Sequence, residues 1–162
     1  MQKIKQTLTN SETHIYIGES IRHLETYLKN KSAVIITDSN VNQHYGAMFP
    51  PCPIIEIGTG EKIKTLETVN HIYNKLLEYN VDRSSFIVGI GGGIVCDIAG
   101  FAAATYMRGV PHGFVATTLL AQADAAIGGK NGVNYAAPNS QNMYKNMIGT
   151  VRQPQFVICD ID

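Results

Sequence analysis

Short apolar runs alternate with longer segments of helical character along the chain. The runs are HIYIG, AVIITD, PIIEIG, SFIVGIG, GFVATT and QFVICD. Their length and their content of β-branched residues are typical of buried strands. Because helical segments lie between them, the pattern predicts an α/β fold with a mostly parallel sheet and helices on both faces.

Two segments have the periodicity or composition of helices. In KTLETVNHIYNKLLEYNV, apolar residues recur at steps of three and four, which leaves Glu67, Asn74 and Glu78 on the outer side. The apolar stripe consists of Leu66, Val69, Ile72, Leu76 and Leu77. Residues 94–107 are apolar on almost every side, which predicts a helix packed within the core.

One long segment has no such pattern. Residues 134–146, NYAAPNSQNMYKN, combine Pro, Ser and several Asn without a period, and they predict an exposed loop.

Length and charge limit the classes of protein to consider. The 162 residues are enough for one domain, residues 1–162. Thirteen basic residues balance thirteen acidic ones without a basic run, so we expect no nucleic-acid partner. No apolar stretch has membrane-spanning length, and MQKIKQTLTN lacks the apolar centre of a signal peptide, so we expect a soluble cytoplasmic protein with no membrane partner. The end at FVICDID, directly after a predicted strand, suggests a domain of a longer protein.

Cysteine and histidine spacing argues against a metal site made by this chain alone. Cys52, Cys96 and Cys159 are far apart and form no C-x-x-C pair, so we expect reduced, buried thiols. The five histidines include no pair at ligand spacing on one helix face.

Residues 91–93 are three consecutive glycines between a predicted strand and the buried helix. Such a turn directs unpaired N–H groups at whatever lies above it, and the missing Cβ atoms let a diphosphate approach. The P-loop pattern is absent, because GGKNG lacks the earlier glycine and has Asn131 in place of Ser or Thr. The dinucleotide pattern G-x-G-x-x-G lacks its third glycine at Ile94. By itself the turn therefore fits a close-packed structural turn and a ligand site equally.

Polar residues follow two predicted strands. In VIITDSN, Asp38 and Asn40 stand where a carboxylate accepts hydrogen bonds from ribose hydroxyls. The alternative is that Asp38 or Ser39 caps the next helix. In GTGEKIK, Glu61 and Lys64 lie one helical turn apart, as a solvated surface pair or as part of a site.

Further candidates follow the run GFVATT. Thr117 and Thr118 either cap the predicted helix LLAQADAAIG or face a ligand. Asp124 stands alone among apolar residues of that helix, so it either faces a cleft or is neutralised by Lys130. Both alternatives predict a polar pocket near residues 124–130.

The longest signal is the pattern GGGIVCDIAGFAAATYMRGV, followed by TTLLAQADAAIGGKNGVN and YKNMIGTVRQP. Together with TDSN, GEKIK and VDRSS, these residues resemble the 3-dehydroquinate synthases, the shikimate-pathway members of the sugar phosphate cyclases. The resemblance leaves out only the N-terminal segment.

The resemblance implies a Rossmann-like N-terminal domain that binds NAD. It places Asp38 and Asn40 on the adenosine side, the glycine turn at the pyrophosphate and Asp97 on the nicotinamide side. The implied cofactor-binding residues are Asp38, Asn40, Glu61, Lys64, Gly92, Gly93, Ile94, Asp97, Thr117, Thr118, Leu120, Lys130 and Lys145.

The resemblance also implies an activity: 3-deoxy-D-arabino-heptulosonate 7-phosphate is converted to 3-dehydroquinate and phosphate, with NAD transiently reduced. The implied catalytic residues are Asp124, Lys130, Lys145 and Asn146, together with Arg108, which reaches a phosphate in the neighbouring subunit of a homodimer. The family's zinc or cobalt ligands, a glutamate and two histidines, lie in a C-terminal helical domain that this chain lacks. We therefore expect the chain alone to bind NAD without turnover.

Three departures and three alternatives accompany the resemblance. Cys96 stands where the family usually has Gly, Ala116 stands where it usually has Pro, and the segment between Asn134 and Lys145 is longer than usual. The alternatives are another sugar phosphate cyclase, a metal-dependent polyol or glycerol-phosphate dehydrogenase, and a non-catalytic dinucleotide-binding module.

Overall fold

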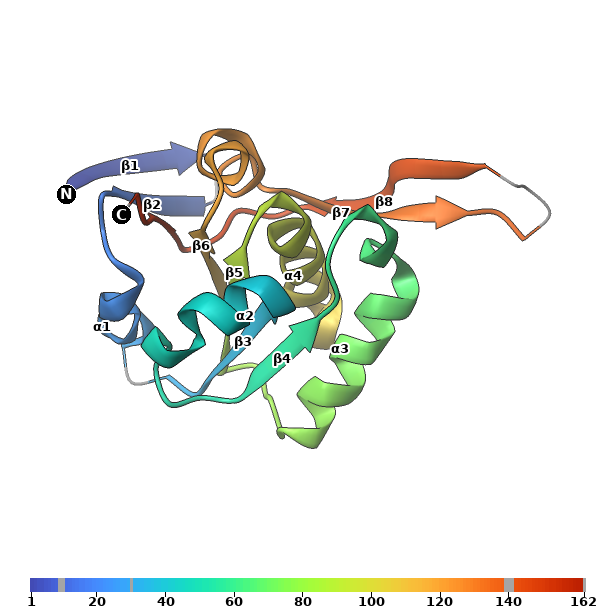
Figure 1. Ribbon diagram of the computed structural model, residues 1–162, viewed down its shortest axis with the longest axis horizontal. Helices are drawn as coiled ribbons and strands as arrows, with labels where there is room; N and C mark the ends of the chain where they lie inside the picture. The colour runs from blue at the N-terminus through green and yellow to red at the C-terminus, as the bar shows by residue number, and fades with distance from the viewer. Residues whose placement is uncertain (9–10, 30, 139–141, 162) are drawn as a thin grey trace.

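A computed structural model describes residues 1–8, 11–29, 31–138 and 142–161 (Figure 1). Within them, seven strands form one sheet in the order β1-β2-β9-β6-β5-β3-β4. The strands are β1 (Gln2–Leu8), β2 (Ser11–Ile17), β3 (Ala33–Asp38), β4 (Ile54–Ile57), β5 (Phe86–Gly91), β6 (His112–Ala116) and β9 (Phe156–Cys159). Neighbouring strands are parallel except β1, which pairs antiparallel with β2. The predicted mostly parallel sheet is confirmed, and each of the six apolar runs overlaps a strand; the largely polar β1 was missed.

The strand order creates a crevice at one edge of the sheet. Strands β4-β3-β5-β6-β9 follow the doubly wound order 2-1-3-4-5, in which the chain leaves β3 and β5 toward opposite sides. Ligands of open α/β sheets bind at the carboxyl ends of the strands flanking this switch point. Thr37 of β3 is in register with Ile90 of β5, so Asp38 and the glycine turn at residues 91–93 lie side by side there.

Helices cover both faces of the sheet (Figure 1). The helices α3 (Leu66–Glu78) and α4 (Gly93–Thr105) pack on one face, and α1 (Leu24–Leu28) and α2 (Ser39–Tyr45) pack on the other. Side chains of β3 alternate between the two layers: Ile36 joins the α3 and α4 cluster, and Ile35 joins the α1 cluster. This arrangement confirms the predicted helices on both faces.

Helix α4 is buried on most sides, as its composition predicted. Its buried residues are Val95, Cys96, Ile98, Ala99, Gly100, Phe101, Ala102 and Ala103. The stripe predicted for α3 is confirmed at Val69, Ile72 and Leu76, which are buried. It is wrong at Leu66 and Leu77, whose exposed fractions are 37% and 64%. Leu66 is the first residue of the helix, and Leu77 is rotated about 100° from the buried Leu76.

The loop predicted for residues 134–146 is wrong over most of its length. An antiparallel hairpin of β7 (Lys130–Ala136) and β8 (Met143–Val151) extends away from the domain (Figure 1). Residues 139–141, also part of the predicted loop, lie outside the described residues. The hairpin escaped prediction because β8 is mostly exposed, so its pairing leaves no alternation of apolar and polar residues.

The helix predicted for LLAQADAAIG is also irregular. Its central part is the five-residue π-helical segment η5 (Ala121–Ala125). Short 3₁₀ turns occur at η1 (Ile21–His23), η2 (Gly46–Met48), η3 (Glu61–Ile63) and η4 (Tyr106–Arg108). No helix in the described part of the chain is both long enough and apolar enough to cross a bilayer.

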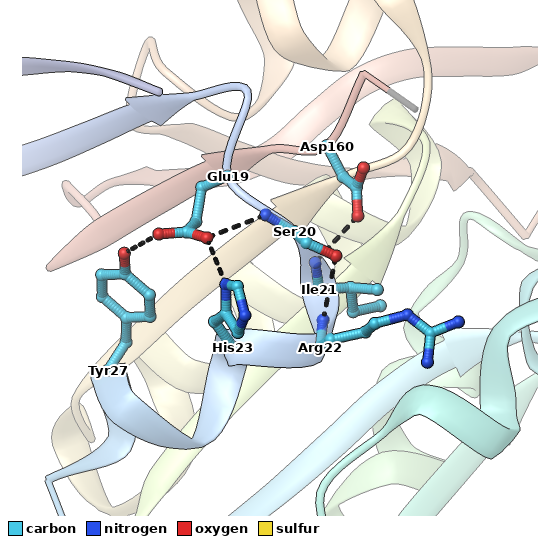
Figure 2. A network of polar contacts seen from close by, with 7 residues as sticks. All are labelled: Glu19, Ser20, Ile21, Arg22, His23, Tyr27 and Asp160. Carbon is cyan, nitrogen blue, oxygen red and sulfur yellow. Dashed lines mark hydrogen bonds and ion pairs between the residues drawn. The ribbon is translucent and has the colours of Figure 1, made fainter.

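A polar network holds η1 and α1 against the end of β9 (Figure 2). The Glu19 carboxylate accepts a hydrogen bond from the Tyr27 hydroxyl at 2.5 Å and lies 2.7 Å from Nδ1 of His23. These two contacts lower the pKa of Glu19. Asp160, directly after β9, accepts a hydrogen bond from the backbone N–H of Ile21 at 2.8 Å. The network fixes the entry into α1 at the carboxyl edge of the sheet.

Candidate functional site

A cleft of about 770 Å³ opens at the carboxyl ends of β3, β4, β5 and β6. This volume is within the range of small-molecule and cofactor sites. Predicted site residues that line it are Asp38, Asn40, Glu61, Lys64, Gly92, Gly93, Ile94, Asp97, Thr117, Thr118, Leu120, Asp124 and Asn146. The fold therefore brings together residues that are far apart in sequence, at the crevice that the strand order creates.

The glycine turn serves both packing and the cleft. A Cβ on Gly91 would lie 2.6 Å from Cγ2 of Val95, so this position needs glycine for packing. Gly92 caps α4 with extended backbone, and no side chain caps the helix. The first N–H groups of a helix have no partners within it, and here the first residues of α4, Gly93 and Ile94, line the cleft. A Cβ on Gly93 would lie 3.2 Å from the Cβ of Ala125, so α4 packs closely against η5 at the border of the cleft.

Two predicted capping residues are caps and also line the cleft. Oδ1 of Asp38 accepts a hydrogen bond from the N–H of Val41 at 2.9 Å, which confirms the capping interpretation at the start of α2. Oγ1 of Thr118 accepts one from the N–H of Ala121 at 3.3 Å. Because both side chains also border the cleft, capping does not exclude a role toward a ligand.

Lys64 and Asp97 form a largely buried ion pair. Nζ of Lys64 lies 2.6 Å from Oδ2 of Asp97, and the exposed fractions of the two side chains are 6% and 21%. Lys64 also donates to Oδ1 of Asn146. Burial raises the pKa of Asp97, and Lys64 opposes that shift. The surface-pair interpretation of Glu61 and Lys64 is therefore wrong, because Lys64 turns inward and bonds Asp97.

A second cavity of about 460 Å³ adjoins the first and shares Asp97, Asp124 and Asn146 with it. Lys130 lines this second cavity. The predicted polar pocket near residues 124–130 is confirmed. Of the two alternatives for Asp124, the structure supports a position facing a cleft.

Two predicted site residues lie outside both cavities. The Lys145 side chain is 71% exposed, and its Nζ lies 3.9 Å from Oε1 of Glu61. Arg108 is exposed in η4, where its φ of 67° is left-handed. Neither residue lines either cavity of this chain.

Several residues at or behind the cleft were not predicted from the sequence. His44 and Tyr45 at the end of α2 line the larger cavity, and Asn131 lines the smaller one. Asn134, a buried residue of β7, holds Glu61 without lining either cavity. No local signal marks them, because they reach the site only through the packing of α2 and of the hairpin.

The three cysteines are free thiols, and they differ in burial. Cys96 and Cys159 are buried and free, as expected, whereas Cys52 is only half-buried. Among the described residues, no group of three His, Cys, Asp or Glu side chains is arranged to hold a metal ion. The described residues thus do not fit a metal, and ligands in a further domain remain a prediction.

Sequence comparison decides the family. The family model described as the 3-dehydroquinate synthase N-terminal domain matches residues 54–162. The chain belongs to the 3-dehydroquinate synthase family. A 3-dehydroquinate synthase of Saccharolobus solfataricus is 40% identical over all of this chain and 45% of its own length. One from Ruminiclostridium cellulolyticum is 43% identical over 85% of this chain and 39% of its own length. The chain therefore spans less than half the length of these relatives, and the family resemblance extends into the N-terminal segment.

Solved structures agree with this family and fold. A 2-deoxy-scyllo-inosose synthase complexed with carbaglucose-6-phosphate, NAD+ and Co2+ superposes with a TM-score of 0.82 at 26% identity, over 98% of this chain and 45% of its own. The 2-epi-5-epi-valiolone synthase of Streptomyces hygroscopicus subsp. jinggangensis, with NAD+ and Zn2+ bound, has a TM-score of 0.79 at 25% identity, over 96% and 44%. A probable glycerol dehydrogenase from Sinorhizobium meliloti shares the fold alone, with a TM-score of 0.61 at 20% identity. The predicted Rossmann-like fold is confirmed.

Proposed function

We propose that residues 1–162 are the NAD-binding domain of a 3-dehydroquinate synthase and bind the cofactor in the larger cleft. The observation that carries this proposal is the start of α4 at the switch point, where no side chain caps the helix and Gly92 and Gly93 line the cleft. An open helix start and missing Cβ atoms suit a diphosphate. The NAD+ in two structurally similar cyclases supports the same ligand.

The cleft residues divide into groups along such a dinucleotide. Asp38 and Asn40, at the end of β3, would hold the adenosine ribose, and Gly92, Gly93 and Ile94 would bind the pyrophosphate. Six further cleft residues would surround the nicotinamide half: Glu61, Lys64, Asp97, Thr117, Thr118 and Leu120. Because Lys64 holds Asp97 at 2.6 Å, that carboxylate is already oriented before a ligand arrives.

The smaller cavity would receive the substrate, 3-deoxy-D-arabino-heptulosonate 7-phosphate, which is converted to 3-dehydroquinate and phosphate. NAD, when bound, supplies a transient oxidation of a substrate alcohol. Lys130 would offset negative charge on the substrate, while Asp124 and Asn146 would bond its hydroxyl groups. Each charge-assisted contact contributes about 1.5–3 kcal/mol. The described residues offer no ligand set for a metal ion.

Arg108 and Lys145 would act outside the cleft of their own chain. Arg108 is exposed and lines neither cavity, so we propose that it reaches a phosphate in the neighbouring subunit of a homodimer. Lys145 is near Glu61 at the rim, where it would approach cofactor and substrate from the side of β8.

A second candidate is another sugar phosphate cyclase. The observation that favours it is the superposition of 2-deoxy-scyllo-inosose synthase over 98% of the chain. Measuring phosphate release by the full-length enzyme separates the two candidates. A 3-dehydroquinate synthase should release phosphate from the heptulosonate phosphate, whereas another cyclase should release it from a different phosphorylated sugar.

Calorimetric titration of the 162-residue chain with NAD+ tests the cofactor proposal. We expect one NAD+ per chain, and at least tenfold weaker binding for Gly93→Val, whose side chain would meet Ala125 at the border of the cleft. Ala104→Val adds similar bulk near the far end of α4, away from both cavities, and should bind normally. Absence of binding by the unmodified chain, or normal binding by Gly93→Val, would refute the proposal.

A substrate assay tests the expected dependence on a further domain. The chain alone should release no phosphate from the heptulosonate phosphate. Turnover by the purified chain would show that the catalytic groups are complete without another domain.

A further inference from the structure

Asn134 is a buried amide that contacts the cleft residues without lining either cavity. Its exposed fraction is 3%. It lies on β7 of the hairpin, next to the segment that leads into α3. A buried side-chain amide needs partners for both its donor and its acceptor. The groups that bond its donor and its acceptor therefore show why an amide stands at this position.

Three hydrogen bonds join Asn134 to two separate walls of the cleft. Its Nδ2 donates to Oε1 of Glu61 at 2.8 Å, and its Oδ1 accepts from the backbone N–H of Asn146 at 2.9 Å. Its own backbone N–H donates to the carbonyl of Lys64 at 2.8 Å. Glu61, Lys64 and Asn146 all line the larger cleft. Asn134 thus joins the segment 61–64 to β8.

The hairpin is irregular at this position. Val133 pairs with Ile148 and Tyr135 pairs with Tyr144, so three residues of β8, 145–147, lie opposite Asn134 alone. Bulges of this kind redirect side chains near functional sites. Asn146 has a left-handed φ of 52°, and its N–H is satisfied by the Asn134 side chain instead of a backbone carbonyl. The amide therefore stabilises the bulge that presents Asn146 to Lys64.

Asparagine fits this position through its chemistry. An aspartate would place a second carboxylate against Glu61, and an apolar residue would leave the Asn146 N–H without its acceptor. One neutral side chain that both donates and accepts satisfies the two partners together.

We propose that Asn134 is a positioning residue, which holds Glu61 and Asn146 in the arrangement that binds the nicotinamide half of NAD. This role rests on the proposed cofactor site. Asn134 lines neither cavity, so it acts indirectly, through the Glu61 carboxylate that it holds and through the bulge that carries Asn146.

The first test compares Asn134→Ala with a control of similar structural cost. Thr13→Val also removes a buried side-chain hydrogen bond, to the carbonyl of Pro154 at 2.7 Å, in β2, at a residue that lines neither cavity. Calorimetry at a temperature where all variants are folded should show about tenfold weaker NAD+ binding for Asn134→Ala and unchanged binding for Thr13→Val. Equal affinity in the three proteins would overturn the positioning role and leave Asn134 a purely structural residue.

A double-mutant cycle isolates the contact with Glu61. Asn134→Asp keeps the acceptor for Asn146 but repels Glu61, whereas an amide introduced by Glu61→Gln can donate to the new carboxylate. We expect Asn134→Asp to weaken NAD+ binding several-fold less in the Glu61→Gln background than in the unmodified chain. The same loss in both backgrounds would overturn the proposed coupling.

Hydrogen exchange separates this inference from the cofactor proposal, because it needs no ligand. In the chain without NAD+, the Asn146 amide should be protected, and Asn134→Ala should accelerate its exchange at least tenfold while Thr13→Val leaves it unchanged. If the chain binds no NAD+, the cofactor proposal fails, but the hydrogen-exchange experiment still decides whether Asn134 holds Asn146. Unchanged exchange in Asn134→Ala would overturn the inference.

Discussion

The ion pair between Lys64 and Asp97 gives a quantitative prediction for Lys64→Met. This substitution keeps most of the aliphatic side chain but leaves the Asp97 carboxylate without its cation, 2.6 Å away in the native protein. Removing one partner of a fully buried pair costs about 3–5 kcal/mol. Because Asp97 is 21% exposed, water partly solvates the remaining charge, and we expect a loss of about 2–3 kcal/mol in the free energy of unfolding at pH 7.

The loss should depend on pH in a defined direction. Burial raises the pKa of Asp97, and Lys64 opposes the shift. A carboxyl group with a raised pKa binds more protons in the folded state than in the unfolded state, so its contribution to stability falls as the pH rises through its folded pKa. Lys64→Met should raise that pKa further. The destabilisation should therefore be largest at neutral pH and shrink as the pH falls.

Urea unfolding at pH 7 and at pH 5 measures both effects. The double variant Lys64→Met with Asp97→Asn removes both charges and should recover most of the lost stability. A loss below about 0.5 kcal/mol for Lys64→Met, or an equal loss at the two pH values, would show that the pair is solvated and would refute the reasoning.

Three further predictions concern the core. Gly100→Ala should destabilise the fold by about 1–3 kcal/mol despite the better helix propensity of alanine, because the new Cβ would lie 1.9 Å from Oδ1 of the buried Asn131; a higher melting temperature would contradict the packing described. Burial lowers the pKa of His112 to about 3, so stability should fall as the pH decreases from 6.5 toward 3, by up to ~1.4 kcal/mol per pH unit. In urea titrations across that range, His112→Leu should show a weaker dependence, and an unchanged dependence would exclude this histidine as its source. Burial raises the pKa of Cys52 to about 11, so thiol labelling at pH 8 should modify Cys52 slowly and Cys96 only after unfolding; rapid labelling of Cys96 in the native protein would show that its burial is incomplete.

The local pattern of apolar and polar residues determined most of the strands and helices of this protein. The six apolar runs, the stripe of α3 and the all-round burial of α4 follow from side-chain periodicity, which is a property of neighbouring residues. The long glycine pattern was enough for the family, and most residues it implied for the cofactor line one cleft.

The tertiary structure decided the strand order, the hairpin and the inward turn of Lys64. Periodicity does not specify which strands are neighbours, so the switch point between β3 and β5 was not readable from the chain. The segment 134–146 resembles a loop because its order comes from pairing between β7 and β8 and from the side chain of Asn134, contacts between residues distant in sequence. Glu61 and Lys64 resemble a surface pair for the same reason: Asn134 and Asp97, which hold them at the cleft, come from other parts of the chain. Such contacts exist only after the sheet has assembled, because folding alone brings those side chains within bonding distance.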